Sequence, residues 1–383
     1  MNEMKILVTT AIFPPDIGGP ATYVPTMAGE LVKRGHKITV VTLSDRLDHG
    51  DRSYNFPVLR IRRGLFKPLR FFLTVLRILR EGRSAQVLYV NGLYLEAVIA
   101  NYLLRKPMVQ KIVGDWAWER STNKGWVKDS FDDFQTRRHG LKVELLKTLR
   151  TFYARRAHKM IVASHYFARH VAGWGVPEEK ITVISNAVEA PAPSSLTGNE
   201  SIRVPLSTSF NVVTVSRLVP WKHVDELIEA VAHCEGAGLV IIGDGPERGR
   251  LGELVHSHKL ANRVYFAGSR NREETFSLMA ACDLFVLNSS HETFSHVVLE
   301  AMSVGLPVVA RAIGPIPDLV RDGENGVLIA REGNGQLSES LRRLIGSPKE
   351  RERLSYEGQE TAKAYGCEVM VGKTEHILSV CAY

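Results

Sequence analysis

The residues best suited to chemistry lie in two short segments of the second half of the chain. Glu292 and Glu300 stand eight residues apart, one in a polar loop behind the apolar run Leu284–Leu287 and one inside a predicted helix that Gly305 and Pro307 end. A helix that starts behind a parallel strand presents free amides and positive potential, which suit an anion such as a diphosphate. Either glutamate alone would be an ordinary surface carboxylate, so the hypothesis depends on their shared setting. The amides in question belong to Phe294, Ser295, His296 and Val297, and Ser295 or Thr293 is expected to cap the helix.

A pair of cations follows an earlier strand of the same half. Arg217 and Lys222 lie five residues apart, in the loop between the predicted strand Phe210–Val215 and a helix. Arginine offers planar donors and lysine a point charge, so the two side chains can converge on one diphosphate. As isolated residues they would be ordinary surface cations. Gly243 ends another strand, where we expect a structural turn with a ligand nearby.

The elements that position these residues alternate along the whole chain. Strand-like and helical segments follow one another in both halves, and a Pro- and Ser-rich stretch separates them. A length of 383 residues also favours about two domains. We therefore predict an α/β protein of two doubly wound, Rossmann-like domains whose functional loops meet in a cleft. The predicted bounds are 1–188 for the first domain, 189–205 for the linker, 206–365 for the second domain and 366–383 for a final helix.

Composition and charge narrow the class of protein. The chain is 44% hydrophobic and 23% charged, with no apolar run long enough for a bilayer and no signal-peptide pattern. Its four cysteines form no metal-finger spacing, so we expect a reduced, cytoplasmic protein. Residues 1–190 hold 30 basic and 17 acidic side chains, a net +13, and the remaining 19 and 24 give −5. The basic amphipathic stretch Leu65–Arg83 could therefore lie on an anionic membrane, peripherally at the inner face, or pack as a surface helix with a solvated basic face.

The two chemical segments together resemble a known family. Ser290–Val309 closely resembles the Glu-x7-Glu motif of retaining glycosyltransferases of family 4, which have the GT-B fold and belong to glycosyltransferase group 1. Ser216–Lys222 is close to the Ser-Arg-Leu-x-x-x-Lys pattern of that family, and Ser185–Val188 resembles its Pro-Asn-Gly-Val hinge. The resemblance implies transfer of a sugar from a nucleotide-diphosphate sugar to a hydroxyl of a glycan or lipid-linked acceptor, in polysaccharide biosynthesis. It also implies that the final helix crosses back to the first domain.

The resemblance assigns roles to the candidate residues. Arg217 and Lys222 would offset the charge of the leaving diphosphate, Glu292 would bind hydroxyls of the donor sugar, and Glu300 would bind the ribose. Gly18 and Gly19 would lie near the diphosphate, although they could equally form a plain turn. Backbone groups near Arg270 would meet the base. No protein base, cofactor or metal ion is expected, since no Asp-x-Asp motif is present and the cations already neutralise phosphate.

The acceptor side departs from the family. Many members have a histidine where this chain has Val113, Gly114 and Asp115, so Asp115 is our substitute candidate for a contact with a sugar hydroxyl. Trp116 and Trp118 follow it and are candidates for stacking on the apolar face of a sugar ring.

Four other functions compete with sugar transfer. A glycoside hydrolase also uses paired carboxylates but has no need of the phosphate-binding cations. A sugar-nucleotide epimerase of the same fold and a non-catalytic protein that binds nucleotide sugars would both keep them. A nucleic-acid-binding module would need aromatic side chains interleaved with basic ones over a surface, and here the aromatic residues gather in one amphipathic stretch and one loop.

Overall fold

The chain forms two compact units in the computed structural model. Unit 1 comprises Met1–Asn186 and Glu368–Tyr383, and unit 2 comprises Ala187–Cys367. The structure describes residues 3–16, 19–47, 50–188, 204–292, 294–330 and 335–382. Most of the predicted linker, from 189 to 203, lies outside these ranges. No helix within them is long and apolar enough to cross a membrane.

Unit 1 is built on a parallel sheet with the strand order β3-β2-β1-β4-β5-β6-β7. Every pair of neighbouring strands in it runs parallel. The central strands β4 and β5 are buried along their whole length because helices cover both faces, and β5 buries Gln110 and Lys111 among its apolar residues. The strands are β1 (Lys5–Thr10), β2 (Lys37–Ser44), β3 (Val58–Arg62), β4 (Val87–Asn91), β5 (Met108–Ile112), β6 (Lys159–Val162) and β7 (Ile181–Val183).

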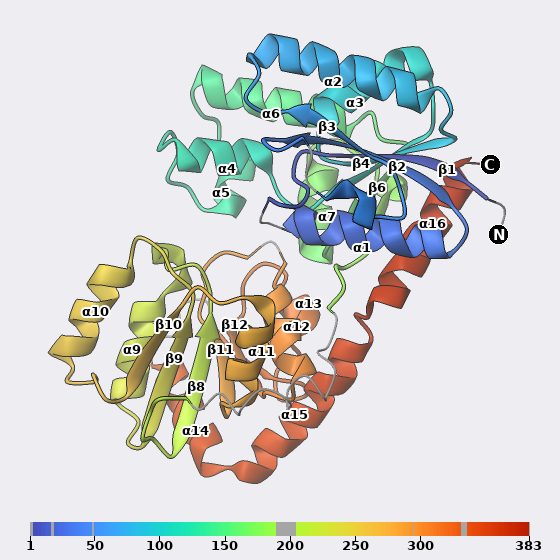
Figure 1. Cartoon of the computed structure of the whole chain (residues 1–383). Coiled ribbons are helices and arrows are strands. Elements are labelled where there is room, and N and C mark those ends of the chain that lie inside the picture. Colours follow the sequence, from blue (N-terminus) through green and yellow to red (C-terminus); the bar gives the residue numbers. More distant parts are fainter. Residues whose placement is uncertain are drawn as a thin grey trace. The chain divides into compact units, whose positions relative to one another are not determined.

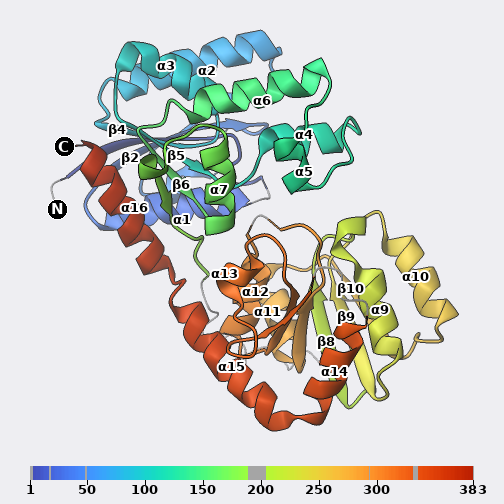
Figure 2. The same ribbon diagram turned by 180° about the vertical axis from the view of Figure 1, so that it is seen from behind.

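The helices of unit 1 lie in two layers. In Figures 1 and 2, α2, α3 and α6 cover one face of the sheet, and α1 and α16 lie on the other. The helices are α1 (Gly19–Lys33), η1 (Asp51–Ser53), α2 (Lys67–Gly82), α3 (Tyr94–Leu104), α4 (Trp116–Asn123), α5 (Phe131–Thr136), α6 (Leu141–Ala154), α7 (His165–Gly173), η2 (Glu178–Lys180) and α16 (Cys367–Ala382).

The last helix packs on the rest of unit 1 through buried apolar residues and one buried carboxylate. Glu375 on α16 accepts a hydrogen bond from Arg34 at 2.8 Å and lies 2.8 Å from Nε2 of His36. The main-chain N–H of Met4 donates to Nδ1 of His36, so the other ring nitrogen carries the proton and donates to Glu375. His36 and Glu375 are both almost fully buried. The end of the chain is thus tied to the turn between α1 and β2.

Unit 2 repeats the plan with a parallel sheet of order β10-β9-β8-β11-β12-β13. Two apolar cores flank this sheet, one beneath α9, α10 and α14 and the other beneath α11, α12, α13 and α15. Its strands are β8 (Phe210–Val215), β9 (Ala237–Ile242), β10 (Val264–Gly268), β11 (Leu284–Leu287), β12 (Val308–Arg311) and β13 (Val327–Ile329). Its helices are η3 (Pro220–Lys222), α9 (Val224–Ala232), α10 (Arg248–Ser257), α11 (Arg272–Ala280), α12 (His296–Ser303), α13 (Ile316–Leu319), α14 (Gln336–Gly346) and α15 (Pro348–Lys363). Two doubly wound, Rossmann-like domains were predicted, and this fold class is confirmed.

Candidate active site

The candidate residues of unit 2 follow four neighbouring strands at one edge of its sheet. Arg270 follows β10, Gly243 follows β9, Arg217 and Lys222 follow β8, and Glu292 follows β11. Because all these strands are parallel and adjacent, their carboxyl ends lie side by side. This edge is where open α/β sheets bind ligands. The fold therefore brings together residues that lie up to 75 positions apart in the sequence.

An ion pair joins the two segments that the sequence singled out. Nζ of Lys222 donates to Oε1 of Glu292, and their side chains are only 17% and 11% exposed. The main-chain N–H of Ser290 donates to the carbonyl of Trp221 at 2.8 Å, which holds the two loops together beside the pair. The ammonium group therefore fixes the direction of the carboxylate, and both groups are already placed before any ligand binds.

Two buried hydroxyls at this edge have no hydrogen-bond partner among the described residues. Ser216 comes directly after β8 and Ser295 directly before α12, and the Oγ of each is buried and unpaired. Ser295 occupies the N-cap position of α12, but its side chain makes no capping bond. Thr293, the other cap candidate, lies outside the described residues. A buried, unpaired hydroxyl costs about 1–3 kcal/mol, so both positions suit a polar ligand.

Arg217 and Glu300 add opposite charges to the edge. Arg217 is exposed in the loop after β8, next to Ser216. Glu300 lies in the second turn of α12, where burial raises the pKa of its carboxyl and Arg272, at 3.9 Å, opposes that rise. Arg270 turns back on its own loop, where its Nε donates to the carbonyl of Ala267 at 2.9 Å.

Gly243 lets two loops of the edge touch. Its φ is +131°, and a Cβ at this position would lie 1.9 Å from the carbonyl oxygen of Ser216. Any other residue would therefore push apart the loop after β9 and the loop that carries Arg217. The glycine acts on the site through packing, beside the cations.

Sequence reasoning missed Asn288 and Arg311. Arg311, at the end of β12, donates to Oδ1 of Asn288 at 3.0 and 2.7 Å and pairs with Glu226 of α9. Asn288 in turn donates to Glu226 at 2.9 Å. This network ties the start of the glutamate loop to two other elements. The available signal was a polar residue directly after the buried strand β11, but nothing in the sequence paired it with residues far along the chain.

The structure corrects two of the acceptor candidates in unit 1. Asp115 is 1% exposed: its Oδ1 accepts from the main chain of Ala117 and Trp118, and its Oδ2 accepts from Arg150 and Gln135. This burial contradicts the expected contact with an acceptor sugar, because the carboxylate caps α4 and neutralises Arg150 instead.

The two tryptophans of α4 differ in exposure. Trp118 packs edge-on against Phe131 at 5.5 Å and donates to the carbonyl of Asp129, so its ring is not a free stacking surface. Trp116 is 37% exposed and stays a candidate. Gly19 opens α1, and Gly18 lies outside the described residues. Within the described ranges, no group of three or more His, Cys, Asp or Glu side chains could hold a metal ion.

Comparison with known proteins matches both halves of the chain to glycosyltransferases. Residues 17–190 match the model "Glycosyltransferase Family 4", and residues 201–361 match "Glycosyl transferases group 1". The lipopolysaccharide core biosynthesis glycosyltransferase LpsD of Rhizobium meliloti is 37% identical over 50% of this chain and 54% of its own length. LpsE of the same organism is 37% identical over 39% of this chain and 44% of its own length, so each match spans about half of the relative or less. An uncharacterized glycosyltransferase of Methanocaldococcus jannaschii is 26% identical over 89% of both chains.

Solved structures extend the likeness to the whole fold. HepE of Anabaena, solved in complex with UDP, superposes with a TM-score of 0.80 at 24% identity, covering 98% of this chain and 100% of its own. WaaG, a glycosyltransferase involved in lipopolysaccharide biosynthesis, superposes with a TM-score of 0.69 at 17% identity over 98% of this chain and 99% of its own. With both halves matched by family models and the whole chain by the fold, this protein belongs to the family 4, group 1 glycosyltransferases of the GT-B fold.

Proposed function

We propose that this glycosyltransferase moves a sugar from a nucleotide-diphosphate sugar to a hydroxyl of a glycan or lipid-linked acceptor, with retention of configuration and without a metal ion. The observation that carries the proposal is the Lys222–Glu292 pair, set between the exposed Arg217 and the start of α12 on one sheet edge. A cation and a carboxylate side by side suit a ligand that has both phosphates and sugar hydroxyls.

The first requirement of this reaction is to stabilise the leaving group. As the bond between C1 of the sugar and the β-phosphate oxygen breaks, negative charge grows on the diphosphate. Arg217, Lys222 and the first amides of α12 would meet that charge. Fixed donors of this kind lower a barrier by several kcal/mol, about 2.7–4 kcal/mol for one well-placed donor.

The second requirement is to hold the donor and to manage the acceptor proton. Glu292, directed by Lys222, would accept hydrogen bonds from the donor sugar, and Glu300 from the ribose. The new bond joins the acceptor oxygen to C1 while the C1–phosphate bond breaks, and the acceptor proton passes to the departing phosphate oxygen. No side chain is assigned as a general base, so Glu292 and Glu300 act by binding.

The relatives support a nucleotide sugar and a glycan-building role. LpsD and LpsE are named for lipopolysaccharide core biosynthesis, and a relative in Mycobacterium tuberculosis, 32% identical over 43% of this chain, is named a GDP-mannose-dependent alpha-mannosyltransferase. HepE has also been solved with UDP-glucose. Two nucleotides thus occur among these proteins, so the base that this chain uses is a matter for experiment.

A calorimetric screen of UDP-, GDP- and ADP-sugars tests the proposal. We expect one donor class to bind, its sugar to appear in a product with the same anomeric configuration by NMR, and EDTA to leave the rate unchanged. Inversion at C1, an epimerised donor, or activity lost with EDTA and restored by Mg²⁺ would each contradict a named part of the proposal.

We also propose that the protein works in the cytoplasm, on the inner face of a membrane, through helix α2. Phe66, next to its N-terminus, is 77% exposed, and Leu69, Phe72, Leu73 and Leu76 are exposed along the helix. Arg77 and Arg80 lie among them. Such a surface buries apolar side chains among lipids while its cations meet anionic headgroups.

Flotation with anionic vesicles tests the membrane contact. Binding at low salt should weaken as salt rises and should fall further in Arg70→Glu/Arg77→Glu. Neutral vesicles are the control. If anionic vesicles do not bind at low salt, α2 is an ordinary surface helix.

A further inference from the structure

A pocket lies in unit 1, lined by the loop after β1, by β2, by the end of β3 and by α2. It has a volume of about 480 Å³, within the range of small-molecule sites. It opens at the carboxyl ends of β1, β2 and β3, the sheet edge at which α/β domains bind ligands. Its walls are formed by Ala11, Ile12, Asp16, Leu43, Arg63 and Arg70.

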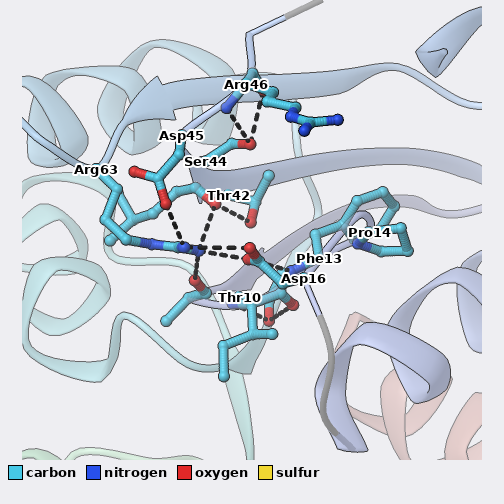
Figure 3. A network of polar contacts seen from close by, with 12 residues as sticks. Thr10, Phe13, Pro14, Asp16, Thr42, Ser44, Asp45, Arg46 and Arg63 are labelled. Carbon is cyan, nitrogen blue, oxygen red and sulfur yellow. Dashed lines mark hydrogen bonds and ion pairs between the residues drawn. The ribbon is translucent and has the colours of Figure 1, made fainter. Parts of the chain in front are cut away.

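One wall is a rigid ion-pair network in which Arg63 holds two carboxylates. Figure 3 shows its guanidinium between Asp16 and Asp45. Nη1 donates to Asp16 at 3.1 Å and to Asp45 at 2.9 Å, and Nη2 donates to the other oxygen of Asp16. The hydrogen bond from Arg63 lowers the pKa of Asp16, which therefore stays ionised. Asp16 can still accept a hydrogen bond from a ligand hydroxyl, because a carboxylate has about four acceptor positions.

A second arginine fixes the same loop from behind. Arg60 is 2% exposed and donates to the carbonyl of Pro14 at 2.7 Å. It also binds both oxygens of Asp51 at 2.7 Å. The loop that carries Asp16 is thus held by two guanidinium groups, which makes the pocket preformed.

Arg70 adds a positive charge to the pocket from outside the Arg63 network. Its Nη1 donates to the main-chain carbonyl of Arg63 at 2.7 Å, which aims the side chain at the pocket. Within the described residues, no carboxylate lies in ion-pair distance of Arg70. Glu96 attracts it from farther away, and burial raises the pKa of that carboxyl. A guanidinium that is oriented, partly exposed and unmatched suits an anionic group.

The same helix connects the pocket to the apolar surface of α2. Arg70 lies one turn from Phe66 and next to Leu69, both exposed. An anionic group beside Arg70 therefore has exposed aromatic and aliphatic side chains within one helical turn. A ligand with a charged head and a long apolar tail fits both features at once.

We infer that this pocket binds the phosphate-bearing head of a lipid-linked acceptor, with the phosphate on Arg70, a head hydroxyl on Asp16 and the lipid chain along Phe66 and Leu69. The inference rests on the proposed function and narrows its acceptor class. The rigid Arg63 network selects the head by shape, and Arg70 supplies the charge recognition.

Calorimetry with three probes separates recognition of the phosphate charge from recognition of the lipid chain. The probes are a short-chain isoprenoid diphosphate, the corresponding uncharged alcohol, and inorganic diphosphate, each measured in the Lys222→Gln background to weaken binding at the proposed donor site. We expect the isoprenoid diphosphate to bind most tightly. Equal affinity for the alcohol would overturn the role of Arg70, and equal affinity for inorganic diphosphate would overturn the lipid contact.

Two matched arginine variants of unit 1 make the test specific. Arg70→Gln should weaken binding of the isoprenoid diphosphate about tenfold, the effect of losing one charge-assisted hydrogen bond. Arg138→Gln removes the same charge from an exposed side chain that does not line the pocket, so its effect should stay below about twofold. Equal losses in both variants would mean general electrostatic attraction and would overturn the pocket. Donor binding, measured separately with Lys222 intact, should be the same in Arg70→Gln as in the wild type, and a wild-type protein that binds no donor would refute the proposed function separately.

Discussion

Replacing Lys222 by glutamine tests the central claim, because it removes one charge and nearly preserves the length of the side chain. In the free enzyme the ammonium group pairs with Glu292, and both side chains are partly shielded from water. Losing the pair should cost about 1 kcal/mol of unfolding free energy, well below the value for a fully buried pair. Losing a cation that meets the leaving diphosphate should cost about 2.7–4 kcal/mol in the transition state, a rate loss of about 10²–10³.

The assay must show that the loss of rate is much larger than the loss of stability. Nucleotide release under saturating donor should fall by about 10²–10³ in Lys222→Gln, while the melting temperature changes by only a few degrees. Lys349→Gln is the matched control, since Lys349 is an exposed lysine of the same unit at the start of α15. Glu292→Gln keeps a polar partner and should raise KM for the donor, since Glu292 is assigned to binding. A Lys222→Gln enzyme with near-normal turnover would refute the reasoning, as would a rate loss that only tracks lost stability.

Three further changes test how unit 1 is held together. Glu375→Ala should loosen α16, which would be seen as faster hydrogen exchange of its amides. Burial alone would raise the pKa of Glu375, but the hydrogen bonds from His36 and Arg34 lower it overall. In the wild type this attachment should therefore hold above about pH 4.5 and fail as the pH falls through the lowered pKa. Lys111→Met should raise the melting temperature, with a gain of about 1–2 kcal/mol, because the buried ammonium group of Lys111 faces the Tyr23 ring at 3.9 Å and has no hydrogen-bond partner among the described residues. Burial lowers the pKa of Lys111 to about 7, so only the unfolded chain holds this proton between that pH and its ordinary pKa of 10.5, and the gain should shrink as pH rises across the interval. Asp115→Ala should destabilise unit 1 by about 3 kcal/mol, because Arg150 loses a buried partner and α4 loses its cap, whereas the acceptor KM of the protein that still folds should not change.

The alternation of strands and helices could be predicted because its causes are local. A strand covered on both faces is apolar along most of its length, and β9 and β11 show this pattern, whereas β5 interrupts it with Gln110 and Lys111. Turn residues between such runs then mark the loops. The tie between Glu375 and His36 could not be predicted from the residues, because it joins positions 339 apart and neither belongs to a periodic pattern.

That the donor candidates lie close together could be predicted for a physical reason. Arg217, Lys222 and Glu292 lie in the segments that follow β8 and β11, and the order of parallel strands then brings these segments to one edge. Their neighbourhood therefore follows from topology. Asn288 and Arg311 escaped notice because their role is to hold the loops, which depends on a pairing that only the folded chain defines.

Asp115 shows where reasoning from a single position fails. It lies in the loop after β5, at the sheet edge where open α/β folds bind ligands, and its carboxylate can accept a hydrogen bond from a sugar hydroxyl. The same chemistry also suits the first amides of α4, and a basic helix packed against that loop supplied Arg150. A carboxylate behind a strand is therefore open to a ligand only if the following helix and its neighbours leave it unsatisfied. Asp16 behind β1 meets that condition in part, because it is ion-paired at a pocket wall and keeps room for one more hydrogen bond. Both residues are aspartates, so our proposal chooses Asp16 for the acceptor contact because its carboxylate can accept one more hydrogen bond, whereas Asp115 is buried and bonded on both oxygens.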